Sequence, residues 1–123
     1  MGAQGLKVLV VEDEAIVSML MEDFLQDLGC EVVGPAFDLD EARALVGSKE
    51  FDAAILDVNL GGVRTYDLAD ELAGKGKPFA FATGYGAAGL RDQDQDRPIL
   101  QKPFTIDDLS GVVTKLAAES ATA

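Results

Sequence analysis

Four short and mostly apolar runs recur along the chain, and each is closed by polar side chains. Runs of this kind are typical of parallel strands buried on both faces. Because the carboxyl ends of parallel strands meet at one edge of a sheet, we expect the closing polar groups to gather there. Acidic groups, a hydroxyl and a lysine at one edge suit a divalent cation and a phosphoryl group. The runs and their closing residues are Val8–Val11 with Glu12 and Asp13, Ala53–Leu56 with Asp57, Phe79–Ala82 with Thr83, and Ile99–Gln101 with Lys102.

The interval between the first two runs carries two helical patterns. Residues 14–28 place apolar side chains along one stripe, and Gly29 follows as the expected stop. Asp38 and Glu41 have the spacing of a capping box at the start of the next helix, which Gly47 ends. We therefore predict two amphipathic helices in the first half of the chain.

The second half continues the alternation, with one weak segment. A helix is predicted over residues 66–73, ending at Gly74. Thr105 is the expected cap of the last helix, with Asp108 at the box position. Residues 87–97 contain a polar run and little apolar surface, so we expect only a short or mobile helix there.

Three further assignments complete the outline. Glu31–Pro35 has the pattern of a second strand, ended by its proline. Asn59–Gly62 is predicted to be a loop because two consecutive glycines break regular structure. We assign residues 1–118 to one domain and expect the small polar tail, residues 119–123, to fray.

The predicted fold class is α/β, with strand and helix repeated five times. Such alternation indicates a parallel sheet with helices on both faces, a three-layer sandwich. Right-handed crossovers leave few topologies, and we expect the flavodoxin-like strand order 2-1-3-4-5. In that order the first and third strands are neighbours, so Asp13 and Asp57 would lie side by side.

Composition limits the classes of function. The 123 residues fit one domain, and 48% hydrophobic residues are enough for a core. Ten basic and 22 acidic residues give a formal net charge of −12. Because nucleic acids and anionic membranes attract basic surfaces, we expect neither as a direct partner. A protein with a more basic patch is the expected partner.

Cys30 is the single cysteine, and the chain has no histidine. An internal disulfide, histidine-based catalysis and histidine zinc ligation are therefore excluded. No apolar stretch approaches the ~20 residues that span a bilayer. A lone thiol is typical of a reducing compartment, so we expect a cytoplasmic protein.

Taken together, the motifs resemble the receiver domain of bacterial two-component response regulators. Each motif alone is weak, but all of them occur in order between the expected elements, and the resemblance covers nearly the whole chain. Residues 78–86 also resemble the Phe-Ala-Thr-Gly subgroup of receivers, which often stand alone. The motifs are Glu12-Asp13, Asp57, Thr83 and Lys102-Pro103.

The resemblance implies a role for each acidic residue. Asp57 would accept a phosphoryl group from the phosphohistidine of a sensor histidine kinase, forming an aspartyl phosphate. Asp13 and Asp57 would bind Mg²⁺ through their side chains, Asn59 through its backbone carbonyl, and Glu12 through water. On its own, Asp57 is more readily explained as a solvated aspartate at a strand end, which is a common feature. Glu12 and Asp13 alone would suit the positive end of a helix dipole.

The resemblance gives the two other polar positions contacts with the phosphoryl group. Lys102 would pair with a phosphoryl oxygen, and the cis bond that the family has before Pro103 would position it. Thr83 would donate its hydroxyl to another oxygen. Without the resemblance, Lys102 reads as a surface lysine and Thr83 as a β-branched residue that favours a strand end.

Two departures from the family pattern concern the loop and the switch. The loop after Asp57 usually carries a proline, and residues 58–62 have none. The position three before the lysine usually holds a switch aromatic, and here it is Ile99. Tyr85 is the nearby aromatic that could replace it. Tyr85 could equally contact a partner or simply be exposed.

The function predicted from these residues is a phosphorylation-controlled signalling receiver. Phosphorylation would shift the face formed by strand 4, helix 4 and strand 5, and this face would regulate a downstream protein partner. The domain could equally serve as a relay intermediate or a phosphate sink. We expect a monomer or a weak dimer.

Two other functions compete with this one. A Mg²⁺-dependent phosphohydrolase with an aspartate nucleophile typically has a second acid two residues further on, where this chain has Asn59. Since an amide cannot act as acid or base, we do not expect an enzyme that turns over external substrates. A constitutive binding module of receiver fold is favoured only by Ile99 at the switch position.

Overall fold

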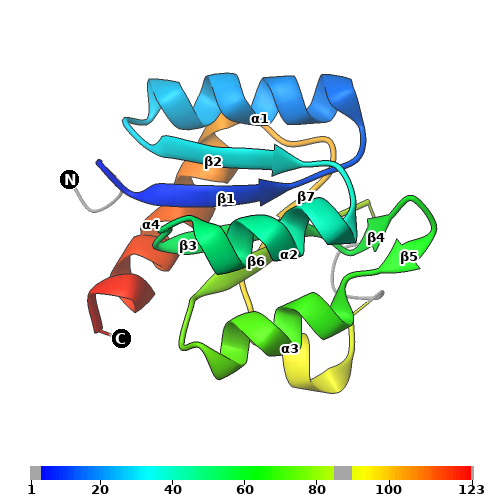
Figure 1. The fold of residues 1–123 in the computed structure, drawn as a ribbon. Helices are drawn as coiled ribbons and strands as arrows, with labels where there is room; N and C mark the ends of the chain where they lie inside the picture. Colours follow the sequence, from blue (N-terminus) through cyan, green and yellow to red (C-terminus); the bar gives the residue numbers. More distant parts are fainter. Residues whose placement is uncertain (1–3, 85–89, 123) are drawn as a thin grey trace.

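The computed structural model describes residues 4–84 and 90–122, which form a parallel sheet covered by helices on both faces (Figure 1). No helix within these residues is both long and apolar enough to cross a membrane. The prediction for Tyr85 lies outside the described residues. The sheet and helices below follow the labels of Figure 1.

In the part of the chain that the structure describes, five parallel strands form the main sheet in the order β2-β1-β3-β6-β7. Numbered along the chain without the two short strands of a separate hairpin, this is the predicted order 2-1-3-4-5. The predicted fold class is therefore confirmed. The strands are β1 (Lys7–Val11), β2 (Glu31–Ala36), β3 (Ala53–Asp57), β6 (Phe79–Thr83) and β7 (Ile99–Gln101).

Within the described residues, four α-helices flank the sheet in two layers. Leu9 and Val11 of β1 face one layer, and Val8 and Val10 face the other, because side chains alternate along a strand. One core cluster joins the sheet to α1 and α4, and a second joins it to α2 and α3. The helices are α1 (Ala15–Asp27), α2 (Leu39–Ser48), α3 (Tyr66–Gly74) and α4 (Ile106–Thr122).

Both predicted capping pairs are present. Asp38 Oδ1 accepts a hydrogen bond from the Glu41 N–H at 2.8 Å, which caps α2. At the start of α4, Thr105 Oγ1 accepts from the Asp108 N–H at 3.1 Å, and Asp108 accepts from the Thr105 N–H at 2.9 Å. This reciprocal pair satisfies two backbone donors that a helix start leaves open.

The prediction of a loop at residues 59–62 is wrong. These residues belong to a hairpin of β4 (Asn59–Leu60) and β5 (Val63–Arg64). Gly61 and Gly62 have φ of 58° and 88°. Positive φ at both central residues closes a tight turn whose twist matches the strands, so the glycines that break longer elements here build a hairpin. In Figure 1 it projects beside the end of the sheet toward which the β1 and β2 arrows point.

The structure also moves two predicted element ends. Strand β2 continues through Pro35 to Ala36, since β2 is an edge strand and a proline there removes no central hydrogen bond. Helix α4 continues to Thr122, although the sequence predicts fraying from residue 119. The capping pair and the buried Leu116 and Ala117 hold this helix against the sheet.

The weak segment before β7 contains no α-helix in its described part, residues 90–97. A single 3₁₀ turn spans Asp92–Asp94. Arg91 holds this segment on α3, because its guanidinium lies 2.9 Å from Asp70, 2.7 Å from Asp94 and 4.5 Å from the centre of the Tyr66 ring. These ion pairs raise the pKa of Arg91. Of the five predicted helices, the described chain thus has four α-helices and one 3₁₀ turn.

Candidate functional site

The strand register brings the predicted polar residues to one edge of the sheet. Val11 pairs with Leu56 across β1 and β3, so the residues that follow, Glu12 and Asp57, are neighbours. Asp57 and Thr83 end β3 and β6, and Lys102 follows β7. The clustering predicted from the apolar runs is therefore present.

Asp57 is a nearly buried carboxylate with two polar contacts. Its Oδ2 lies 3.1 Å from Lys102 Nζ, and its Oδ1 accepts a weak hydrogen bond from the Asn59 N–H at 3.3 Å. A cleft of about 540 Å³ opens beside it, lined by Asp13, Glu14, Asp57, Asn59, Gly61, Gly62, Gly84 and Lys102.

Glu12 is fully buried and faces the same lysine. Its Oε1 lies 2.7 Å from Lys102 Nζ, and its Oε2 accepts a hydrogen bond from the Glu14 N–H at 3.1 Å. Burial and, to a smaller degree, the charge of Asp57 raise the pKa of Glu12 to about 7, against the lowering effect of Lys102 and the Glu14 amide. Because its pKa lies near neutral pH, the Glu12 carboxyl can take up a proton when the positive charge of Lys102 moves away.

Lys102 is the cation that these acids share. Its Nζ contacts Glu12, Asp57 and, at 3.7 Å, Glu14. Burial lowers its pKa, but the pairs with Glu12 and Asp57 outweigh burial, and the net pKa is raised. Lys102 N–H donates to the Thr83 carbonyl at 2.9 Å, and the bond to Pro103 is cis. The lysine, which lines the cleft, is therefore held by both its backbone and its side chain.

Asp13 stands at the open side of the cleft. Its Oδ2 accepts a hydrogen bond from the Gly61 N–H at 2.8 Å, which ties it to the hairpin turn. Glu12, Asp13, Glu14 and Asp57 each present a carboxylate oxygen, and these oxygens lie within 4.8 Å of one another. Hard oxygen donors at this density suit a divalent cation such as Mg²⁺, which would screen their mutual repulsion. The donor set therefore fits the cation that the sequence predicts.

Residues 8–114 match the family described as the response regulator receiver domain. The chain belongs to this family. The resemblance predicted from the motifs is thereby confirmed.

Related proteins match this receiver domain over most of its length. The transcriptional regulatory protein PdtaR of Mycobacterium tuberculosis is 35% identical over 107 residues, which cover 84% of this chain and 52% of PdtaR. The two-component response regulator PhoP of Pseudomonas aeruginosa is 32% identical over 122 residues, covering 94% of this chain and 53% of PhoP. The receiver domain thus spans about half the length of these curated relatives.

A solved structure agrees with the receiver domain over almost its full length. The solution structure of SdrG from Sphingomonas melonis Fr1 matches with a TM-score of 0.80 and 40% identity, covering 98% of this chain and 99% of that chain. The topology of this receiver domain is thus that of a solved relative.

Two polar residues of the receiver site were not predicted from the sequence. Glu14 joins the carboxylate cluster, and its only signal is that it directly follows Glu12 and Asp13. Thr65 is fully buried, and its hydroxyl donates to the Asp57 carbonyl at 2.7 Å. It lies eight residues from Asp57 at the far foot of the hairpin, so no strand-end pattern marks it.

Thr83 lies at the predicted edge of the receiver sheet. Its side chain is nearly buried, and the residue after it, Gly84, lines the cleft. The position that usually holds the switch aromatic, Ile99, is half-buried and packs beside the core cluster of α2 and α3.

Proposed function

We propose that Asp57 accepts a phosphoryl group from the phosphohistidine of a sensor histidine kinase, in a reaction that depends on Mg²⁺. The observation that carries the proposal is the Asp57 carboxylate itself, placed on the cleft between a shared lysine and a cluster of carboxylates. In the transfer, an Asp57 oxygen forms a bond to phosphorus while the bond from phosphorus to the donor imidazole breaks. The imidazole leaves with the electron pair of that bond.

Each polar residue of the site has a part in this transfer. Asp13 and Asp57 would hold Mg²⁺ with their carboxylates, Asn59 with its carbonyl and Glu12 through water. When bound, the cation neutralises charge on the transferring oxygens. Lys102, whose Nζ is 3.1 Å from Asp57, moves onto a phosphoryl oxygen, and Thr83 donates its hydroxyl to another.

A group of exposed apolar side chains, called the apolar rim below, supports the view that the phosphoryl donor is a protein. The large hydrophobic side chains that are exposed within the described residues include three on the first half of α1, one after β2 and one at the start of β5. All belong to segments at the end of the sheet that carries the site (Figure 1). Exposed apolar groups clustered around a polar cleft are typical of a docking surface. The rim consists of Ile16, Met19, Leu20, Phe37 and Val63.

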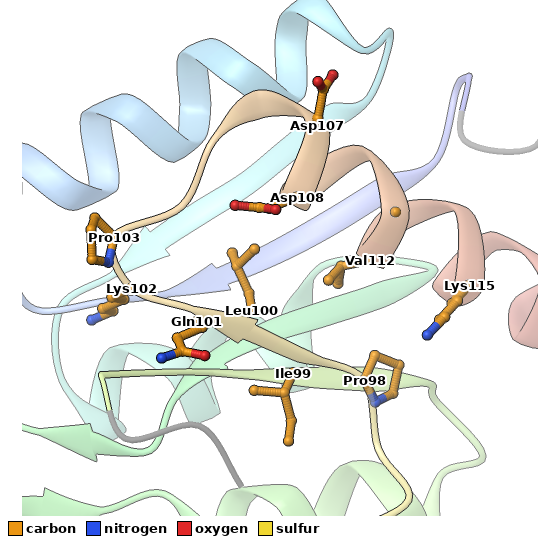
Figure 2. A pocket seen from close by; sticks show the side chains of 11 residues that line it. Pro98, Ile99, Leu100, Gln101, Lys102, Pro103, Asp107, Asp108, Val112 and Lys115 are labelled. Carbon is orange, nitrogen blue, oxygen red and sulfur yellow. The ribbon is translucent and has the colours of Figure 1, made fainter.

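We further propose that the output surface lies over β7 and α4. A cavity of about 610 Å³ runs between them, and Figure 2 shows Ile99 and Lys102 on the strand side, with Asp108 and Lys115 on the helix side. Lys102 is one of the residues that line this cavity, so its movement toward a phosphoryl group would change the cavity wall. SdrG has also been solved in a BeF3-activated conformation, and that structure matches this chain with 41% identity. This relative supports control of the domain by phosphorylation.

The test is intact-mass spectrometry after incubation with acetyl phosphate, with and without Mg²⁺, on the wild type and Asp57→Asn. The expected result is one phosphate adduct that requires both Mg²⁺ and Asp57. An adduct on the variant would place the phosphoryl group elsewhere. If the folded wild type took no phosphate from acetyl phosphate or from any sensor kinase tried, a constitutive binding module would be the better account.

A further inference from the structure

The segment after Asp57 is braced at its foot by Thr65. The Thr65 hydroxyl donates to the Asp57 carbonyl at 2.7 Å and lies 3.3 Å from the Val58 carbonyl oxygen. Its backbone N–H donates to the same Val58 carbonyl at 3.0 Å. The side chain has no exposed surface, so water does not compete for these bonds.

The hydroxyl of Thr65 does not cap the helix that begins after it. Thr65 is the N-cap residue of α3, and a threonine there normally accepts a hydrogen bond from the first turn of the helix. The Thr65 side chain forms no such bond, so it does not stabilise the start of α3 in this way. The hydroxyl instead serves the carbonyl of the residue proposed to accept phosphate. The side chain of Thr65 therefore contacts the site and not the first turn of α3.

The hairpin is attached to the site at its tip as well. The Gly61 N–H donates to Asp13 Oδ2 at 2.8 Å. Between tip and foot, Asn59 pairs with Arg64, next to the pair that flanks the two-residue turn. In such a ladder the pair flanking the turn exchanges hydrogen bonds and the next pair does not. The Asn59 carbonyl therefore stays outside the ladder, and its direction depends on how Thr65 and Gly61 hold the hairpin.

We propose that Thr65 is a positioning residue for the metal site. Its hydroxyl fixes the Asp57 backbone and the foot of the hairpin, so that the Asp57 carboxylate and the Asn59 carbonyl meet the same cation. The inference rests on the proposed function, because it requires Mg²⁺ to bind at this cleft. Residues that orient ligands in this way typically change metal affinity by 10- to 100-fold when they are removed.

The test is calorimetric titration of Mg²⁺ alone into the wild type, Thr65→Val and Thr65→Ser. Valine keeps the shape and removes the hydroxyl, whereas serine keeps the hydroxyl. We expect about tenfold weaker binding for Thr65→Val and a change of less than about twofold for Thr65→Ser. Thr65→Ala, which leaves room for a water at the Asp57 carbonyl, should also weaken binding and serves if the valine variant folds poorly.

Thr114→Val is the matched control. The Thr114 hydroxyl also donates to a backbone carbonyl, that of Ser110 at 2.8 Å, but on the exposed face of α4. This control should bind Mg²⁺ as the wild type does. Wild-type affinity in folded Thr65→Val, or equal loss in Thr65→Ser and Thr65→Val, would overturn the inference. A wild type that binds no Mg²⁺ would instead count against the proposed function.

Discussion

Lys102 competes with the cation that the cleft is proposed to hold. Its Nζ lies among the same carboxylate oxygens, 2.7 Å from Glu12 and 3.1 Å from Asp57. Lys102→Gln should therefore leave Mg²⁺ affinity unchanged or higher, since it removes a positive charge. The same change should slow phosphorylation by acetyl phosphate roughly 100-fold, because one donor to the transferring oxygens is lost. Calorimetry and a mass-spectrometric time course measure the two effects separately.

Equal losses in Mg²⁺ affinity and in rate would contradict this role for Lys102. They would mean that the lysine only organises the carboxylates. Lys115→Gln is a suitable control, because Lys115 is also a lysine on the β7–α4 side but lies on α4. It should change neither quantity.

Glu12 gives the metal-free protein a pH-dependent stability. Burial raises its pKa from 4.5 to about 7 in the folded state. Since the folded protein binds this proton more tightly than the unfolded chain, the stabilising contribution is complete below pH 4.5 and is lost as the pH rises through about 7. Glu12→Gln stays neutral at every pH and should lose this dependence. Between about pH 5 and about pH 8, the free energy of unfolding of the wild type should fall by on the order of 2 kcal/mol more than that of the variant.

Urea unfolding in the presence of a chelator measures this difference. The chelator matters because a bound cation would hold Glu12 in its charged form. Parallel pH profiles for the wild type and Glu12→Gln would show that the buried carboxyl keeps its ordinary pKa. The sign would be reversed if Lys102 stabilised the charged carboxylate more than burial opposes it.

The sequence predicted those site residues that end strands or directly follow them. Asp57, Thr83 and Lys102 are found this way because a strand end in a parallel sheet has one location, whatever the loops do. Thr65 cannot be found by such a rule. Thr65 reaches Asp57 because the hairpin between them turns the chain back. The spacing of the residues in this segment does not predict that turn.

The secondary-structure elements that the sequence predicts are likewise the periodic ones, and those that it misses are short or irregular. The helices α1 and α4 and the central strands carry patterns long enough to be read, and their ends agree with the sequence to within a few residues. The hairpin strands β4 and β5 are two residues long, which is too short for any alternation to show. The 3₁₀ turn at Asp92–Asp94 depends on Arg91 reaching α3, a tertiary contact that no local pattern contains.

Helix α1 should decide how well a kinase reaches the site. Ile16 is 82% exposed in its first turn and belongs to the apolar rim. Ile16→Asp should slow phosphotransfer from a sensor kinase at least about fivefold, since a charge within an apolar contact typically costs more than 1 kcal/mol. Phosphorylation by acetyl phosphate, which needs no docking, should keep its wild-type rate. Mass spectrometry with each donor separates the two cases.

Gln26→Asp is the matched control for the rim. Gln26 is exposed on the last turn of α1, at the end of the helix away from the site. The Gln26→Asp variant should accept the phosphoryl group from the kinase at the wild-type rate. Equal rates of phosphotransfer from the kinase to Ile16→Asp and Gln26→Asp would mean that the apolar rim plays no part in docking.

The whole molecule carries a net charge of −12, and four of its carboxylates converge on one cleft. Repulsion among like charges destabilises a compact state, so any cation in solution relieves some of it. A bound Mg²⁺ does more, because it stabilises only the folded state in which the ligands are assembled. Site binding and general screening therefore predict different responses of stability to salt.

At ten times its dissociation constant, Mg²⁺ should stabilise the wild type by about 1.4 kcal/mol, which corresponds to a rise in Tm of roughly 5 °C. Asp13→Asn removes one carboxylate from the cluster and should lose most of this rise, while its Tm without Mg²⁺ should not fall, since it removes like-charge repulsion. Thermal unfolding in NaCl of equal ionic strength gives the screening contribution of each protein. If Asp13→Asn gained as much from Mg²⁺ as the wild type, the stabilisation would come from the overall charge and not from this site.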